Sequence, residues 1–205
     1  MDNLLVKARS ALLDALEALN EQHDSIVVVG AQAIYLHSGH ADVAIAEATK
    51  DSDLAVDPRE LPEEPLLEEA MKRAGFYPNV NGQPGAWLNP AGIPVDLMVP
   101  DALSLGSSSH RGARIPPHSK HATRRTVGLE AAVVDNEPRT ISALDPDDTR
   151  TFEARVAGPA ALLVAKVHKI HERRDQPDRY PRRHRHDRHG YRRHRRHGRG
   201  HDPRH

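Results

Sequence analysis

The chain of 205 residues is long enough for one sizeable domain with an appendage, and only 3% of its residues are aromatic, so its core must be aliphatic. The absence of Cys excludes disulfides, thiolate metal sites and Cys nucleophiles. The net charge of zero hides an asymmetry, because residues 173–205 hold 13 Arg and 4 acidic residues, a charge of +9, which leaves −9 in the rest of the chain.

Hydrophobic periodicity in the first half of the chain predicts alternating helices and strands. Leu and Ala recur at helical spacing near the N-terminus, and a run of β-branched residues follows them. The expected elements are a helix over 3–21, a buried strand over 25–29, a helix over 31–37, a strand over 54–56 and a helix over 62–74.

The second half is predicted to contain shorter strands and one long helix. Two strands flank a turn of Asn, Pro and Gly at 89–92, and a polar loop covers 103–125. The further expected elements are strands over 86–88, 94–99, 126–134, 140–143 and 151–156, and a helix from Gly158-Pro159 to about residue 174. This order of elements indicates an α/β or α+β core.

Nothing in the sequence indicates a membrane protein. The longest nearly apolar stretch, Ile26–Leu36, is much shorter than the ~20 residues of a membrane-spanning helix. The N-terminus lacks the basic and apolar regions of a signal peptide. We therefore expect a cytoplasmic protein that makes no contact with a membrane.

The C-terminal tail differs in composition from the domain before it. From Arg173 onward it contains no Ala, Val, Leu, Ile, Met or Phe, so it has no aliphatic surface to offset the entropy of ordering. We predict a folded domain over 1–175 and a disordered Arg/His-rich tail over 176–205. Such a tail suits contacts with phosphates. It can equally lie against the acidic domain, or result from a shifted reading frame.

Three Asp residues on two predicted strands form a candidate metal site. Alternation in the strand that begins with Asp51-Ser52-Asp53 places Asp51 and Asp53 on one face. Asp96 interrupts an apolar strand and faces away from the core. If the two strands are neighbours, the three carboxylates converge, and such a cluster needs cations to offset the repulsion between like charges. Magnesium, which prefers oxygen ligands and phosphates, suits this site.

The junction between the first strand and the second helix is a candidate phosphate site. A strand that ends in Gly30 at the start of a helix leaves backbone amides free to bind an anion. Glycine also occurs at such turns for backbone reasons alone. The sequence there matches neither a dinucleotide-binding GxGxxG motif nor a Walker loop, which argues against dehydrogenases and P-loop ATPases.

These motifs resemble those of the polymerase-β-type nucleotidyltransferase superfamily. Within it, the chain is most similar to the AbiEii-like toxin nucleotidyltransferases of type IV toxin–antitoxin systems. The resemblance covers residues 3–175 and rests on three segments: Val-Val-Val-Gly30-Ala31-Gln-Ala, Thr-Lys50-Asp51-Ser-Asp53-Leu-Ala-Val and Val-Asp96-Leu-Met.

The resemblance implies a mixed sheet flanked by helices and the transfer of a nucleoside monophosphate from an NTP to a hydroxyl acceptor. The acceptor would be tRNA, and a cognate antitoxin would be a partner. The implied roles are Mg²⁺ or Mn²⁺ binding by Asp51, Asp53 and Asp96, with Asp96 also placed to deprotonate the acceptor, and nucleotide binding by Gly30, Ala31, Lys50, Lys166 and Lys169. Lys166 would also contribute to catalysis by facing the triphosphate.

The chain departs from the family pattern in three ways. Ala31 stands where a Gly or Ser is usual, and the spacing from Gly30 to Asp51 is long. A later helix of the family is missing where the tail begins. These departures leave open an alternative, a catalytically inactive, truncated or frame-altered relative that binds NTP or RNA without turnover.

Two basic segments complete the predicted site. On the last helix, Lys166, Lys169 and Arg173 share one face. The opposite, buried side is predicted to hold Leu162, Leu163, Val167 and Ile170. The polar loop before residue 126 contains several Arg and Lys residues, which suit contacts with phosphate or with a protein partner.

Overall fold

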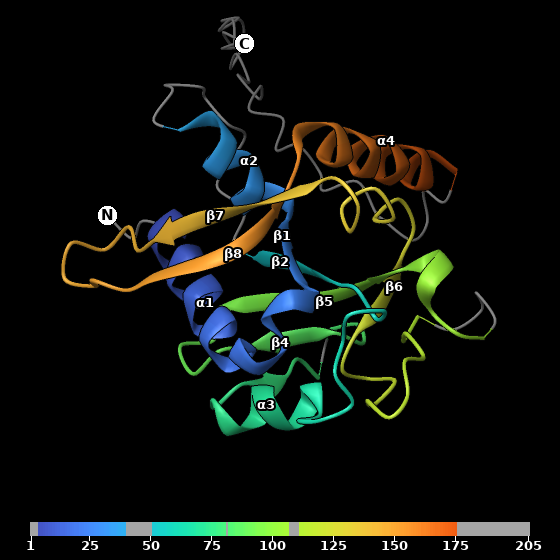
Figure 1. The fold of residues 1–205 in the computed structure, drawn as a ribbon, viewed down its shortest axis with the longest axis horizontal. Helices are drawn as coiled ribbons and strands as arrows, with labels where there is room; N and C mark the ends of the chain where they lie inside the picture. The colour runs from blue at the N-terminus through green and yellow to red at the C-terminus, as the bar shows by residue number, and fades with distance from the viewer. Residues whose placement is uncertain (1–3, 40–50, 81, 107–110, 176–205) are drawn as a thin grey trace, which may run out of the picture.

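An eight-stranded mixed sheet forms the centre of the computed structural model, which describes residues 4–39, 51–80, 82–106 and 111–175 (Figure 1). The strands are β1 Ile26–Val29, β2 Ser52–Val56, β3 Tyr77–Pro78, β4 Ala86–Leu88, β5 Pro94–Pro100, β6 Arg124–Thr126, β7 Asn136–Ser142 and β8 Thr151–Ala157. The helices are α1 Leu4–Ala18, α2 Gly30–Ser38, α3 Leu67–Arg73 and α4 Pro159–Asp175, with short 3₁₀ helices at Asn20–Ser25 and Asp101–Leu103.

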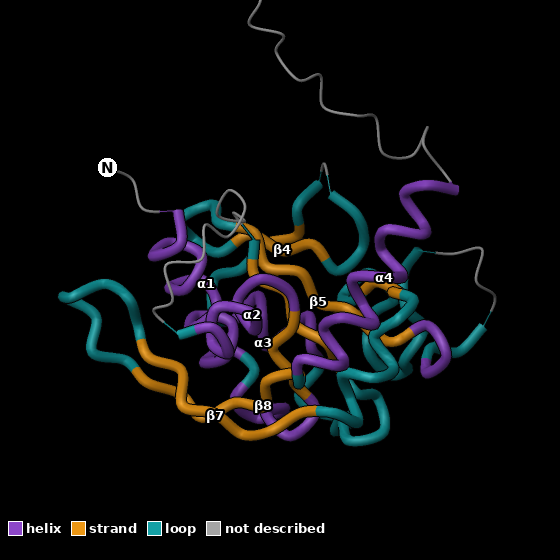
Figure 2. The backbone as a smooth tube through the Cα atoms, turned by 90° about the horizontal axis from the view of Figure 1, so that it is seen from above, coloured by secondary structure: helices purple, strands orange, loops and turns teal. Residues whose placement is uncertain are grey.

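The strand order is β3-β4-β5-β2-β1-β8-β7, with β6 paired to β5. β2 runs antiparallel to β1 and parallel to β5, while β1 runs parallel to β8, so the sheet is mixed as expected. β7 and β8 form an antiparallel hairpin that projects from the rest of the molecule, as Figure 2 shows. The pair of β2 and β5 therefore lies inside the sheet, between β4 on one side and β1 on the other.

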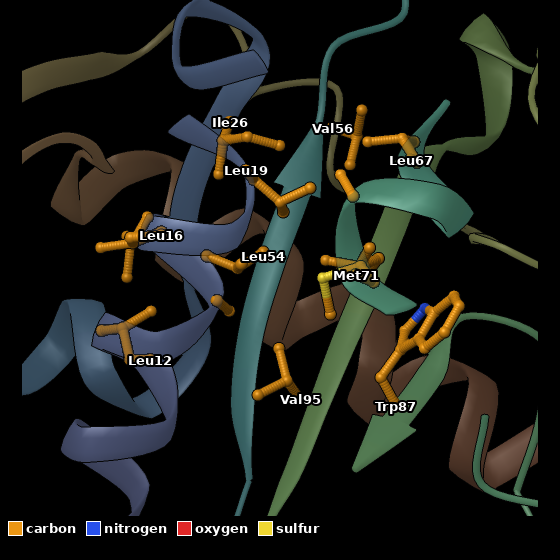
Figure 3. Packing of buried hydrophobic residues seen from close by; sticks show 14 of the residues in the cluster. Leu12, Leu16, Leu19, Ile26, Leu54, Val56, Leu67, Met71, Trp87 and Val95 are labelled. Atoms are coloured by element: carbon orange, nitrogen blue, oxygen red, sulfur yellow. The ribbon is translucent and has the colours of Figure 1, made fainter. Parts of the chain in front are cut away.

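The two faces of the sheet carry different cores. On one face, Leu54 and Val56 of β2 pack with side chains of α1 and α3 in the larger hydrophobic cluster (Figure 3). On the other face, Ala55 belongs to a smaller cluster that includes Ala161 of α4. Because side chains alternate along a strand, Asp51 and Asp53 share the face of Ala55, which is the less filled side of the sheet.

Most predicted elements are present, but several differ in length or type, as with β7, which begins at Asn136 where a strand over 140–143 is expected. The helix expected over 62–74 is only α3, which begins at Leu67, because the proline at position 65 disfavours helical backbone before it and cannot donate a hydrogen bond. The strand expected over 126–134 is wrong. Beyond Thr126 the chain forms turns, with Gly128 at φ 84° and the amide of Asp135 bonded to the carbonyl of Ala131.

The rotation of α4 about its axis also differs from the prediction. Leu163, Val167 and Ile170 were expected to be buried, but they are 66%, 57% and 50% exposed. Small residues face the sheet instead, with Ala161 buried and Ala165 partly buried. The N-terminus of α4 is fixed by Asp135, whose Oδ2 accepts a hydrogen bond from the amide of Ala161. Of the four side chains predicted to be buried, only Leu162 packs against the hydrophobic clusters, where it is partly buried.

Among the helices of the described ranges, none is long and apolar enough to cross a membrane. The expected disordered tail over 176–205 lies outside the described residues, as does Lys50.

Candidate active site

The structure brings together the three carboxylates that the sequence singled out. Asp53 of β2 lies opposite Asp96 of β5 in the parallel register of the two strands. Asp51, directly before β2, completes the group, and one carboxylate oxygen from each residue lies within 4.8 Å of the others. We call Asp51, Asp53 and Asp96 the acidic triad. Such a set of oxygen ligands has the chemistry that Mg²⁺ and Mn²⁺ prefer.

A buried hydrogen bond on the opposite face of β2 helps to hold this strand in place. The hydroxyl of Ser52 is buried and donates to the carbonyl of Ala8 in α1 at 2.8 Å. Since Ser52 lies between Asp51 and Asp53, this bond ties the strand to α1 on one face of the sheet, while the two carboxylates point to the other face. The alternation that places the two carboxylates on one face of the strand thus places Ser52 on the other face.

Gly30 lies directly against the triad. Its φ is 65°, in the left-handed region that favours glycine, and a Cβ at this position would collide with the carboxylate of Asp53. Val29, just before it, pairs with Asp53 across β1 and β2. The start of α2, with Gly30 and the half-buried Ala31, is thus next to the acidic triad, and the first amides of a helix have no partner within it.

Burial and like charge raise the pKa of two triad carboxyls. The pKa of Asp53 rises to about 6, first because the group is desolvated and next because of the negative charge of Asp51. Burial also raises the pKa of Asp96, an effect that the nearby Arg124 opposes. The charged forms of Asp53 and Asp96 are thus disfavoured on their own, which is the electrostatic condition under which a cation binds.

Arg124 is a member of the site that the sequence did not reveal. Its Nη2 forms an ion pair with Oδ2 of Asp96 at 2.8 Å and donates a hydrogen bond to Sδ of Met98 at 2.9 Å. The contact arises because β6 pairs parallel to β5 and sets Arg124 beside Met98, two residues beyond Asp96. The sequence had placed this residue in a loop for phosphate or partner contacts, since a strand of three residues gives little local signal.

Arg125, the next residue of the same basic segment, has a structural role. Its Nε donates to Oδ1 of Asp101 at 2.8 Å, and its Nη1 donates to the carbonyl of Gly106 at 3.0 Å. The side chain is 8% exposed. It therefore ties β6 to the 3₁₀ helix that follows β5, and the expectation of phosphate or partner contacts for this basic segment stays a prediction.

The basic residues of α4 differ in their relation to the triad. The positive charge of Lys169 lowers the pKa of both Asp53 and Asp96, opposing the effect of burial, so it lies within electrostatic reach of the triad. Lys166, one turn earlier, is exposed and is not among the charges that act on these two carboxyls. The side chain of Arg173 lies outside the described residues. Of the two lysines of α4, Lys169 is therefore the one whose charge acts on the triad.

Comparison of the chain with protein-family models, with curated proteins and with solved structures gave no match in any of the three.

Proposed function

We propose that this chain is a metal-dependent nucleotidyltransferase, which moves a nucleoside monophosphate from an NTP to a hydroxyl acceptor. The observation that carries the proposal is the convergence of the acidic triad, with carboxylate oxygens within 4.8 Å of one another, beside Gly30 at the start of a helix. Carboxylates for a divalent cation and free amides for phosphates are the two requirements of phosphoryl chemistry on a triphosphate.

The residues of the triad fit Mg²⁺ or Mn²⁺. They offer only oxygen ligands, and burial and the negative charge of Asp51 raise the pKa of Asp53 to about 6, a cost that a bound cation would offset. When bound, ions of this kind neutralise the charge of the triphosphate and stabilise the attacking and leaving oxygens. Asp51, Asp53 and Asp96 would hold them.

The roles proposed for the other residues of the site follow from where they lie relative to the triad. The amides around Gly30 and Ala31 and the ammonium group of Lys169 would bind the phosphates of the NTP. The acceptor oxygen attacks the α-phosphorus, the bond from that phosphorus to the bridging oxygen of the β-phosphate breaks, and pyrophosphate leaves. Asp96 would take the proton of the acceptor hydroxyl. Lys50 and Lys166, which the resemblance also implies, remain candidates for further phosphate contacts.

The acceptor is proposed to be tRNA, and the chain to be the toxin of a toxin–antitoxin pair with a cognate antitoxin as its partner. Two features support this finer proposal: the resemblance of the sequence motifs, and the 13 Arg residues from position 173 onward, whose charge suits a phosphate backbone. A hydroxyl on a small molecule would be served by the same core.

The test is transfer of label from each of the four α-labelled NTPs to total tRNA, with Mg²⁺ or Mn²⁺ present. Asp53→Asn should reduce transfer by at least about 100-fold, because it removes one anionic ligand while keeping the volume. Asp24→Asn is the matched control, since the side chain of Asp24 is 71% exposed and lies outside the triad. It should leave transfer unchanged.

Absence of transfer to tRNA, to the protein itself and to small hydroxyl acceptors, with folded protein and every NTP, would contradict the enzyme proposal. Binding of NTP or RNA without turnover would then favour the inactive relative.

A further inference from the structure

Arg124 contacts a carboxylate of the acidic triad. Its guanidinium forms an ion pair with Oδ2 of Asp96 at 2.8 Å. The side chain of Arg124 is 19% exposed and that of Asp96 is 15% exposed. Asp96 is also one of the three residues that could hold a cation. A guanidinium and a divalent cation are thus directed at the same carboxylate, and the two positive charges repel each other.

Arg124 is poorly satisfied where it stands. Among the described residues, the one further partner of its Nη2 besides Asp96 is the thioether of Met98, which is a weak acceptor. Its Nε is buried and, within the described part of the chain, has no hydrogen-bond partner. A buried donor without a partner is unfavourable, and phosphate oxygens accept from guanidinium groups strongly. Arg124 therefore has spare donor capacity next to the place where the triphosphate is proposed to bind.

We propose that Arg124 competes with the divalent cation for Asp96, so that a free cation binds weakly and binds tightly only when the phosphates of a nucleotide engage Arg124. The role of the nucleotide in this inference rests on the proposed function, whereas the competition between Arg124 and the cation does not. Arg124 would act as a positioning residue, which releases Asp96 to the cation when the substrate is present. Metal loading would in this way depend on nucleotide binding.

The adjacent Arg125 shows how a purely structural arginine differs at this place in the fold. It donates both to the carboxylate of Asp101 and to the carbonyl of Gly106, neither of which belongs to the triad. The two arginines are neighbours on β6 and carry the same charge. Arg125→Met is therefore a matched control for loss of charge without loss of a contact to Asp96.

The experiment is a titration of the full chain with Mn²⁺, with free Mn²⁺ measured by electron paramagnetic resonance. In the absence of nucleotide, Arg124→Met should bind Mn²⁺ at least about fivefold more tightly than the unmodified chain, since one competing positive charge is removed. Arg125→Met should stay within about twofold of the unmodified chain, since its charge does not contact the triad. Adding the α,β-methylene analogues of ATP, GTP, CTP and UTP should tighten Mn²⁺ binding in the unmodified chain more than in Arg124→Met.

The fold of each variant is checked by cooperative melting and by the fluorescence of Trp87, the single and buried tryptophan. Arg124→Gln, which keeps a donor but no charge, must show the same tightening and replaces Arg124→Met if that variant does not melt cooperatively. Unchanged or weaker Mn²⁺ binding in the folded variant overturns the inference, whatever the transfer assay gives. Tighter binding without any nucleotide transfer by the unmodified chain supports the competition and removes the proposed function.

Discussion

Gly30 and Asp53 are in such close contact that no side chain fits between them. The backbone of Gly30, at φ 65°, is where α2 begins, and a Cβ there would enter the space of the Asp53 carboxylate. The start of α2 and the acidic triad are thus in direct contact. This contact is possible because Gly30 has no side chain.

Substitution of Gly30 should therefore be more harmful than substitution of another glycine with a similar backbone. Gly92 also has a positive φ, 76°, and the nearest atom to a Cβ there is the Tyr77 hydroxyl oxygen at 4.0 Å, so Gly92→Ala should cost only the ~1 kcal/mol of a positive-φ backbone. Gly30→Ala adds the collision with Asp53 and should lower the free energy of unfolding by at least about 1 kcal/mol more. Urea unfolding of the two variants measures the difference. Equal costs would show that the contact of Gly30 with Asp53 is not rigid.

The stability of the metal-free protein should fall as the pH rises from about 4 to about 6. The pKa of Asp53 is about 6 in the folded state against 3.8 for a free carboxyl, so in this window the folded state binds more protons than the unfolded state. The free energy of unfolding should decrease by roughly 1–3 kcal/mol across the window and level off above it. Urea unfolding at a series of pH values in the presence of a chelator measures this slope.

Asp53→Asn serves as the control for that slope. It removes the titrating carboxyl, so the decrease should become smaller, and the metal-free variant should be more stable than the unmodified chain by about 1–3 kcal/mol at pH 7.5. A variant with an undiminished slope would assign the titration to another group, and a destabilised variant would contradict the repulsion described for the triad.

The outward face of α4 should tolerate truncation. Val167 is 57% exposed, so Val167→Ala should change the free energy of unfolding by less than about 0.5 kcal/mol. The same substitution at the fully buried Val56 should cost about 1–3 kcal/mol, because it removes core contacts and leaves a cavity. Thermal or urea unfolding compares the pair. A large cost at Val167 would mean that this face of α4 is covered in solution.

The local sequence was sufficient to predict the triad, because its geometry follows from the alternation of side chains along a strand. An acidic residue at every second position of β2, and one within the apolar β5, leaves Asp51, Asp53 and Asp96 on the same side once the strands are neighbours. Position along the chain was likewise sufficient for Gly30, since a glycine between a strand and a helix marks the turn.

Contacts set by pairing between distant segments were not predictable. Arg124 reaches Asp96 only because the three-residue β6 aligns with β5, an alignment that no local pattern encodes. The rotation of α4 was mistaken for a related reason. Periodicity identifies an apolar stripe, but it does not show that Ala161, Leu162 and Ala165 are the residues of α4 that meet the core while Leu163, Val167 and Ile170 stay exposed.

The most direct test of the central claim is the position of a bound metal. Crystals of the chain grown with Mn²⁺ and an α,β-methylene NTP analogue should give an anomalous difference peak about 2.0–2.3 Å from carboxylate oxygens of Asp51, Asp53 and Asp96, with the phosphates beside Gly30. A peak ligated by other residues, or no peak at the triad with nucleotide bound elsewhere, would contradict the assignment of this cluster as a nucleotidyltransferase active site.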